Sequence, residues 1–260
     1  MPTPALPAAD RPAPRVDAAD VRRDLVHRLC AHPVLKGVGM TLGMTGFFVA
    51  YFYLLRHPVF PVTEMPRIAL DHWIPFTPQA LWVYFTLWVY VALTPALLAT
   101  RRELLGFAGW IGALCAFGLG IFWAFPTAVP APLIEPGTYP GFSVLHGVDA
   151  AGNACPSLHV AAAVFSAAWL HRVLHQMQVG PAWRVANALW AIAIVWSTVA
   201  VRQHVVLDVL GGLVLGALFA IPALRWQGRL TRAAGEYDAG ARVAAMDSRA
   251  PGAEGSRENA

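Results

Sequence analysis

The residues best suited to catalysis stand in two short polar clusters of an otherwise apolar chain. The cluster nearer the C-terminus, residues 202–208, reads RQHVVLD. On a helix, His204 and Asp208 share a face, so the carboxylate can accept a hydrogen bond from one imidazole nitrogen and leave the other as nucleophile or base. Asp208 lies in an apolar run, where an unpaired carboxylate costs at least about 2.5 kcal/mol. We therefore expect the two residues to pair.

The other cluster, residues 152–159, reads GNACPSLH. Pro156 suits the first turn of a helix, because its missing N–H would be unpaired there in any case. The N-terminus of such a helix presents free backbone N–H groups and a partial positive charge, which together bind anions. Ser157 adds a hydroxyl donor, and His159 follows about half a turn later. The pattern predicts an anion site beside an imidazole.

The composition indicates which elements must position these clusters. The chain has 260 residues, of which 57% are hydrophobic and only 13% are charged, whereas soluble domains carry about 25% charged residues. Its apolar blocks each approach the ~20 residues that cross ~30 Å of hydrocarbon. The sequence therefore predicts an all-α, polytopic membrane helix bundle with about six transmembrane helices. They are expected at residues 37–55, 79–100, 104–125, 158–175, 185–201 and 205–224.

The two ends of the chain are more polar than this membrane domain, which is expected to cover residues 37–225. Residues 1–36 are predicted to be a cytoplasmic segment that begins disordered and continues as an amphipathic helix over 16–32. Residues 226–260 are rich in Ala, Gly and Arg. They are predicted to form a disordered cytoplasmic tail.

Basic residues mark one side of the predicted membrane domain. They occur in the N-terminal segment, between the second and third spans, around the fourth-to-fifth connection and in the tail, whereas residues 126–157 contain no Lys or Arg. The positive-inside rule then places both termini in the cytoplasm. Both polar clusters are then expected on the non-cytoplasmic face of a cell (inner) membrane. This common location follows from the basic residues and was not assumed from the motifs.

The clusters together indicate one kind of chemistry. An anion cradle, the basic Arg202 and two imidazoles, one of them oriented by a carboxylate, favour phosphoryl transfer through a phosphohistidine. Nucleic acid is not an expected partner, because the Arg residues lie between apolar blocks rather than on one basic face. The three cysteines show no metal-ligand spacing, so no metal site is predicted. A transporter would more often show internal repeats, and we detect none.

The motifs resemble those of the type 2 phosphatidic acid phosphatase and vanadium haloperoxidase superfamily. Residues 155–159, CPSLH, are similar to the family's P-S-[GLM]-H, and residues 204–208, HVVLD, to its H-x-x-x-D, followed here by Gly211 and Gly212. The resemblance covers about residues 60–222. It implies an enzyme without cofactor or metal.

The resemblance assigns a role to each residue of the two clusters. It implies that His204 attacks phosphorus, that Asp208 orients His204, and that His159 protonates the leaving alcohol. Ser157 and the backbone after Pro156, as far as Leu158, would bind the phosphate oxygens.

The chain departs from the family pattern at two expected phosphate-binding cations. The Lys-x6-Arg-Pro motif is absent, and Ser197-Thr198 stands where the family has Ser-Arg. We expect Arg202 to take one of these roles and Arg67, on the outer 56–78 loop, to take the other. With the segment LDHWIPF at residues 70–76, these departures look closer to the inositol phosphorylceramide synthase branch.

These observations lead to one functional hypothesis and two alternatives. The expected function is hydrolysis of a lipid-linked phosphate ester, with a lipid phosphate or phospholipid as substrate and the lipid bilayer as surroundings. The first alternative is transfer of a phospho-alcohol head group between lipids, and the second is a non-catalytic membrane protein or a transporter. The sequence predicts no oligomeric state.

Overall fold

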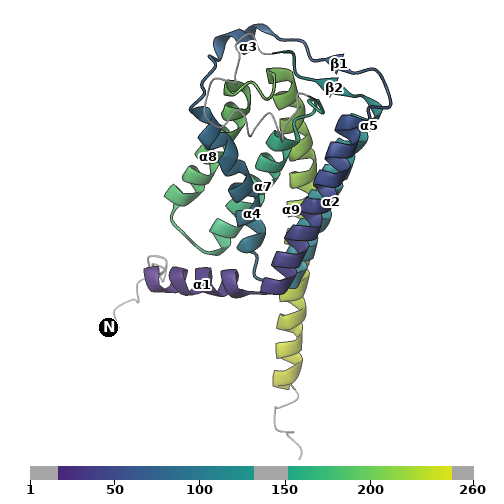
Figure 1. Ribbon diagram of the computed structural model, residues 1–260. Helices are drawn as coiled ribbons and strands as arrows, with labels where there is room; N and C mark the ends of the chain where they lie inside the picture. The colour runs from purple at the N-terminus through teal and green to yellow at the C-terminus, as the bar shows by residue number, and fades with distance from the viewer. Residues whose placement is uncertain (1–16, 132–151, 248–260) are drawn as a thin grey trace, which may run out of the picture.

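A computed structural model describes residues 17–131 and 152–247, with side chains described as far as residue 232. In that part of the chain eight helices form a bundle, and a two-residue parallel strand pair lies at one end of it (Figure 1). The helices are α1 (Ala18–Cys30), α2 (Pro33–Arg56), α3 (Ala69–Trp73), α4 (Ala80–Ala96), α5 (Arg101–Ala124), α7 (Leu158–Gln176), α8 (Pro181–Ala200) and α9 (Val206–Asp247), and the strands are β1 (Thr63–Glu64) and β2 (Thr127–Ala128).

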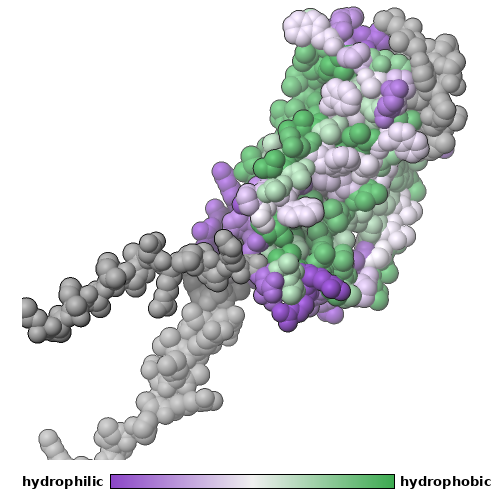
Figure 2. All heavy atoms as spheres, turned by 90° about the vertical axis from the view of Figure 1, so that its left-hand side faces the viewer, coloured by the Kyte–Doolittle hydropathy of each residue, from purple (hydrophilic) through white to green (hydrophobic). Residues whose placement is uncertain are grey.

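A helix covers each of the six predicted spans, and the predicted all-α membrane bundle is confirmed. By length and apolar composition α2, α5, α8 and the first part of α9 can each cross a membrane. The other two helices are too short or too polar for this. α4 has only 17 residues, and the apolar character of α7 is lowered by His159, His171 and His175. Figure 2 shows a broad apolar surface on one side of the bundle, with hydrophilic residues gathered toward its two ends.

The predicted amphipathic segment is the helix α1, which lies across the lower end of the bundle (Figure 1). Its Arg28 is buried, pairs with Asp24 and donates to the carbonyl of Leu97 beyond the end of α4. Lys36, at the start of α2, donates to the carbonyls of Arg28 and Ala96. Two cations therefore tie α1 to the ends of α2 and α4.

The C-terminal segment differs from its prediction. Instead of a disordered tail from residue 226, α9 continues as a helix to Asp247, while residues 248–260 lie outside the described part of the chain. The first residues of the predicted tail are packed against the bundle: Gln227 is buried, and the ring of Trp226 lies against Gly106 of α5. Packing thus carries the helix past the last predicted span, and the Ala-rich and Arg-rich sequence that follows has high helix propensity.

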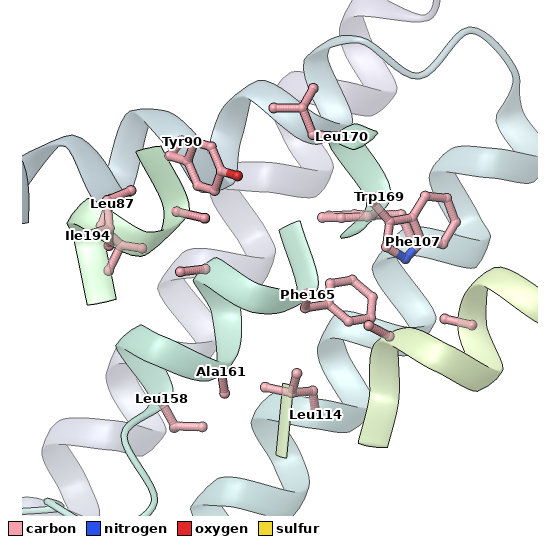
Figure 3. Close-up of a cluster of buried hydrophobic side chains, with 14 of the residues drawn as sticks. Leu87, Tyr90, Phe107, Leu114, Leu158, Ala161, Phe165, Trp169, Leu170 and Ile194 are labelled. Carbon is pink, nitrogen blue, oxygen red and sulfur yellow. The ribbon is translucent and has the colours of Figure 1, made fainter. Parts of the chain in front are cut away.

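The core centres on α7, which contacts α4, α5, α8 and α9. Phe165 and Trp169 of α7 are fully buried, and their rings lie 5.5 Å and 5.4 Å from that of Phe107 on α5 (Figure 3). Aromatic pairs at such distances contribute beyond the area they bury. The helix that begins with the predicted anion site is therefore the most firmly held element of the bundle.

Two glycines of α9 let its backbone approach α7 closely. A Cβ added to Gly212 would lie 2.5 Å from the carbonyl oxygen of Ser157, and one added to Gly216 would lie 2.8 Å from that of Ala161. Small residues at helix contacts are common in membrane bundles for this reason. The two helices that carry the polar clusters are thus packed backbone against backbone.

We expect Gly212→Ala to destabilise the protein by about 1–3 kcal/mol, because the added methyl overlaps a backbone oxygen that cannot move aside. Gly228→Ala is the matched control on the same helix, since its Cβ would meet only the end of the Arg232 side chain, at 4.0 Å. There the helix propensity of alanine should stabilise by up to about 1 kcal/mol. Thermal unfolding in detergent would measure both, and equal midpoints for the two variants would contradict the close contact.

Candidate active site

The first turn of α9 places an imidazole beside a buried carboxylate. Asp208 is the third residue of α9, and its Oδ2 accepts from the backbone N–H of Val205 at 3.0 Å, as an acidic residue does in a capping box. The same oxygen lies 3.4 Å from Nδ1 of His204. His204 was predicted on the helix with Asp208, but it lies just before the helix begins. The expected pairing is nevertheless present, and both side chains are buried.

The imidazole of His159, in the first turn of α7, faces that of His204. Nδ1 of His159 lies 3.2 Å from Nε2 of His204, although 45 residues separate them in the chain. On its other side, Nε2 of His159 lies 3.0 Å from the hydroxyl of Tyr84 on α4. Four side chains from three helical regions therefore form one continuous chain of polar contacts.

The carboxylate of Asp208 determines which atom donates and which accepts in each of these contacts. An ionised carboxylate only accepts hydrogen bonds, so we assign the proton of His204 to Nδ1 and its lone pair to Nε2. Nδ1–H of His159 then donates to that lone pair, and the hydroxyl of Tyr84 donates to Nε2 of His159. The nitrogen of His204 that faces His159 is the one with nucleophilic electrons.

The segment before α7 corrects one expectation. Ser157, rather than Pro156, precedes the helix, and its Oγ accepts from the backbone N–H of Val160 at 3.3 Å. Pro156 lies one residue outside, because serine is a far better N-cap than proline. The backbone N–H of Ser157 donates to the carbonyl of Asp208 at 3.0 Å. That bond joins the starts of α7 and α9, while the side chain of Leu158 packs against Gly118 of α5.

Arg202 occupies an unusual backbone position at the end of α8. Its φ is 63°, a left-handed conformation, and the bonds from its N–H to Val199 and from that of Gln203 to Thr198 form a Schellman motif. Glycine is the usual residue there, since any side chain carries a conformational cost. The guanidinium of Arg202 donates to the carbonyls of Asp71 and Ile74, at 3.1 Å and 2.9 Å.

Arg67 lies in the same outer region. Its guanidinium donates to the carbonyl of Ala131 at 2.7 Å and to that of Pro130 at 3.3 Å. Burial lowers the pKa of the Arg202 guanidinium, the charge of Arg67 lowers that pKa further, and the carboxylate of Asp71 opposes both effects. The two expected phosphate ligands are thus neighbours, and each is held by backbone carbonyls. Thr198, at the position where the family has arginine, is fully buried.

Sequence reasoning missed two residues that complete this arrangement. The buried Asp71 accepts from the N–H of Val206, at the start of α9, and from that of Ile68, both at 2.8 Å. It joins the outer loop to the turn that carries His204. Tyr84 contacts His159 from a different helix. The only sequence signals were an acidic residue in the LDHWIPF segment and a hydroxyl-bearing aromatic near the outer end of the second span.

Part of the chain matches a known protein family. Residues 105–232 match the family model of the PAP2 superfamily. The PAP2 match supports membership of the type 2 phosphatase superfamily and an activity of the phosphatase or phosphotransferase kind. It includes both polar clusters and runs from α5 into α9, whereas α1 to α4, with Arg67, Asp71 and Tyr84, lie before it.

The other comparisons add no relatives to the PAP2 match. Neither the curated proteins nor the solved structures gave a match to this chain. Among the residues that the structure describes, no group of three or more His, Cys, Asp or Glu side chains is arranged to hold a metal ion. The match does not separate one branch of the superfamily from another.

The thiol of Cys155 offers a chemical test of this geometry. Burial raises its pKa to about 11, and the nearby carboxylate of Asp208 contributes in the same direction. Both effects disfavour the thiolate, which is the reactive form. In a Cys30→Ser, Cys115→Ser background we therefore expect maleimide labelling of Cys155 to be slow at neutral pH and to accelerate up to about pH 11.

The Asp208→Asn variant provides the control for this labelling. It removes the negative charge, so the pKa of Cys155 should fall and labelling at a fixed pH should become faster. Mass spectrometry of the labelled protein over time gives both rates. Labelling of Cys155 at neutral pH as rapid as that of the exposed Cys30, measured in a Cys115→Ser, Cys155→Ser protein, would contradict the half-buried position of Cys155 beside Asp208.

Proposed function

We propose that this protein is a membrane phosphatase that hydrolyses a lipid-linked phosphate ester through a phosphohistidine on His204. The observation that carries the proposal is the contact of 3.2 Å between Nε2 of His204 and Nδ1 of His159, with Asp208 behind His204. A nucleophilic nitrogen and a proton donor thus face each other across the place where phosphorus would enter. The PAP2 match supports the same class of reaction.

In the first half of the reaction the phosphate separates the two imidazoles. His159 takes a proton from the monoanionic phosphate ester and becomes imidazolium, with its Nε2–H directed at the oxygen of Tyr84. Nε2 of His204 attacks phosphorus, the bond from phosphorus to the lipid oxygen breaks, and Nδ1 of His159 gives its proton to that oxygen. Asp208 stabilises the positive charge that develops on His204. The lipid alcohol leaves, and a phosphohistidine remains.

In the second half His159 acts as a base. It takes a proton from water, whose oxygen attacks the phosphorus, and the bond between phosphorus and Nε2 of His204 breaks. His159 gives its extra proton back to the phosphate, inorganic phosphate leaves, and both imidazoles are neutral again.

The phosphate oxygens would be held by Arg202, Arg67, the hydroxyl of Ser157 and the backbone N–H of Leu158. Pro156 has no N–H to donate, and that of Ser157 is bonded to the carbonyl of Asp208. The hydroxyl of Ser157 can hold phosphate while capping α7, because a hydroxyl accepts and donates at once.

Head-group transfer is the alternative that one observation favours. The loop of Arg67 and α3 is bonded over the start of α9 through Asp71 and Arg202. A covered site would limit water and allow a lipid hydroxyl to take a phospho-alcohol head group, as expected for an inositol phosphorylceramide synthase-like transferase. Phosphate release from phosphatidic acid, measured with and without an added alcohol acceptor, separates the two reactions.

The site is proposed to face the non-cytoplasmic side of a cell membrane, with both termini in the cytoplasm. In Figure 1 α1 lies at the lower end of the bundle and α3 with the strands at the upper end, where the two clusters meet. The predicted cytoplasmic residues, including Arg101 and Arg102 at the start of α5, belong to the lower end. The arrangement is consistent with the charge distribution of the loops.

Replacing either imidazole tests the reaction directly. We expect His204→Ala and His159→Ala each to reduce phosphate release by more than the ~10²–10⁴-fold typical of losing one acid or base. Only His204→Ala should also abolish acid-labile labelling of the protein by a ³²P-phosphate ester. His171→Ala is the control, because this exposed histidine lies on α7 away from the site. Full turnover in both site variants would exclude a catalytic role for these two histidines.

Arg202→Gly separates the backbone role of this residue from its charge. Glycine suits a left-handed position, which should offset part of the stability lost with the two bonds from the guanidinium to the carbonyls of Asp71 and Ile74. Loss of a charge-assisted contact worth about 1.5–3 kcal/mol should lower kcat/KM about tenfold or more. Gln178→Gly is the matched control, because Gln178 has φ 54° but lies at the other end of α7. Unchanged kcat/KM for Arg202→Gly would remove Arg202 from the phosphate site.

A further inference from the structure

A large apolar cavity lies between α2, α4, α5 and the start of α7. Its volume is about 530 Å³, which is within the roughly 300–1,000 Å³ of sites that bind small molecules. Aromatic and aliphatic side chains form nearly all of its wall, among them Phe47, Phe48, Trp88 and Phe107. A phosphate would find little to bind there, whereas a hydrocarbon chain would be surrounded by apolar groups.

The cavity is elongated along the bundle. It touches α2 from Leu35 to Tyr51, a length of about 24 Å at about 1.5 Å per residue. The hydrocarbon core of a membrane is ~30 Å thick. His159 lines the cavity at the catalytic end, and Lys36 lines it near α1. It therefore extends from the imidazole of His159 through most of the thickness of a bilayer's hydrocarbon core.

Three glycines make the space available. Gly39 and Gly43 of α2 and Gly112 of α5 line the cavity, and a Cβ added to any of them would meet no atom within 4 Å. Gly39 and Gly43 are four residues apart and so share one face of α2. They differ from Gly212 and Gly216, which bring two backbones into contact. Here the missing side chains leave a channel open.

The position of His159 decides which part of a substrate this channel could hold. In the proposed function His159 protonates the leaving oxygen, while His204 attacks phosphorus from the other side. His204 does not line the cavity, and His159 with Tyr84 does. The channel therefore begins on the leaving-group side of phosphorus.

We propose that this cavity binds the hydrocarbon chain of the leaving lipid alcohol, and that Gly39, Gly43 and Gly112 determine which chains it accepts. The proposal rests on the proposed function and specifies its substrate as a phosphate ester of a long-chain lipid. A lipid tail already lies in apolar surroundings, so entering the cavity gains little from the hydrophobic effect. The channel therefore selects lipid chains by the space that it offers them. An experiment should detect the loss of activity on long-chain substrates when that space is filled.

Filling the channel tests the proposal in a purified, detergent-solubilised full chain. We expect Gly43→Leu and Gly39→Leu to lower kcat/KM for long-chain phosphatidic acid by about tenfold or more, the scale on which pockets reject excess volume. Their rates on a tail-free aryl phosphate should remain unchanged. Gly46→Leu is the matched control, because Gly46 lies on α2 in open space but does not line the cavity. It should leave both rates unchanged.

Unchanged kcat/KM for phosphatidic acid in both channel variants would overturn the proposal. Equal losses on the lipid and on the aryl phosphate would also count against it, because they would show a damaged site rather than a blocked channel. The smaller Gly43→Ala substitution should give a loss in the same direction but smaller than that of Gly43→Leu. Melting temperatures of all variants establish that the bundle is intact.

A binding measurement separates this proposal from the proposed function. Phosphatidic acid with a photoreactive group near the end of its chain should cross-link to α2 or α5 in the original protein and in His204→Ala. The cross-link should be lost in Gly43→Leu and kept in Gly46→Leu. Such cross-linking without any turnover would support the chain site while refuting the phosphatase. Turnover of phosphatidic acid with a cross-link that Gly43→Leu does not reduce would refute the chain site alone.

Discussion

The candidate active site depends on one carboxylate, that of Asp208, which is fully buried among apolar helices. Such a group is stable only with hydrogen-bond donors around it. The N–H of Val205 and Nδ1 of His204 share one of its oxygens, and the peptide carbonyl of Asp208 receives the N–H of Ser157. One residue therefore fixes the start of α9, orients one imidazole and joins α9 to the helix that carries the other.

Patterns that are local in the sequence predicted the membrane bundle and the central pair. Apolar blocks of membrane-spanning length gave all six helices of the membrane domain, because in lipid a backbone must bond within its own helix. The spacing of His204 and Asp208 gave their contact, although His204 precedes the helix. The end of α9 was placed too early, since burial of Gln227 and the contact of Trp226 with Gly106 are not local.

The rest of the site required three-dimensional information. Asp71 and Tyr84 reach the clusters from 135 and 75 residues away in the chain, and no spacing rule connects such positions. Arg67 and Arg202 were predicted as replacements for the missing family cations, because both lie on the outer side. The sequence does not indicate what these two side chains contact. In the described structure both guanidinium groups donate to backbone carbonyls. A phosphate would have to compete with those carbonyls for the guanidinium groups.

The backbone contact of Gly212 and Gly216 with α7 also bears on how fast a substrate can be admitted. Helices in such contact cannot part without breaking the bundle, so the facing imidazoles have no hinge between them. Separation of the rings must come from rotation of the side chains themselves. Such rotations take picoseconds to nanoseconds when unhindered, whereas domain motions take microseconds to milliseconds. His204 is buried, so its ring turns more slowly than an exposed one, and opening of the imidazole pair depends on movement of the side chains packed around it.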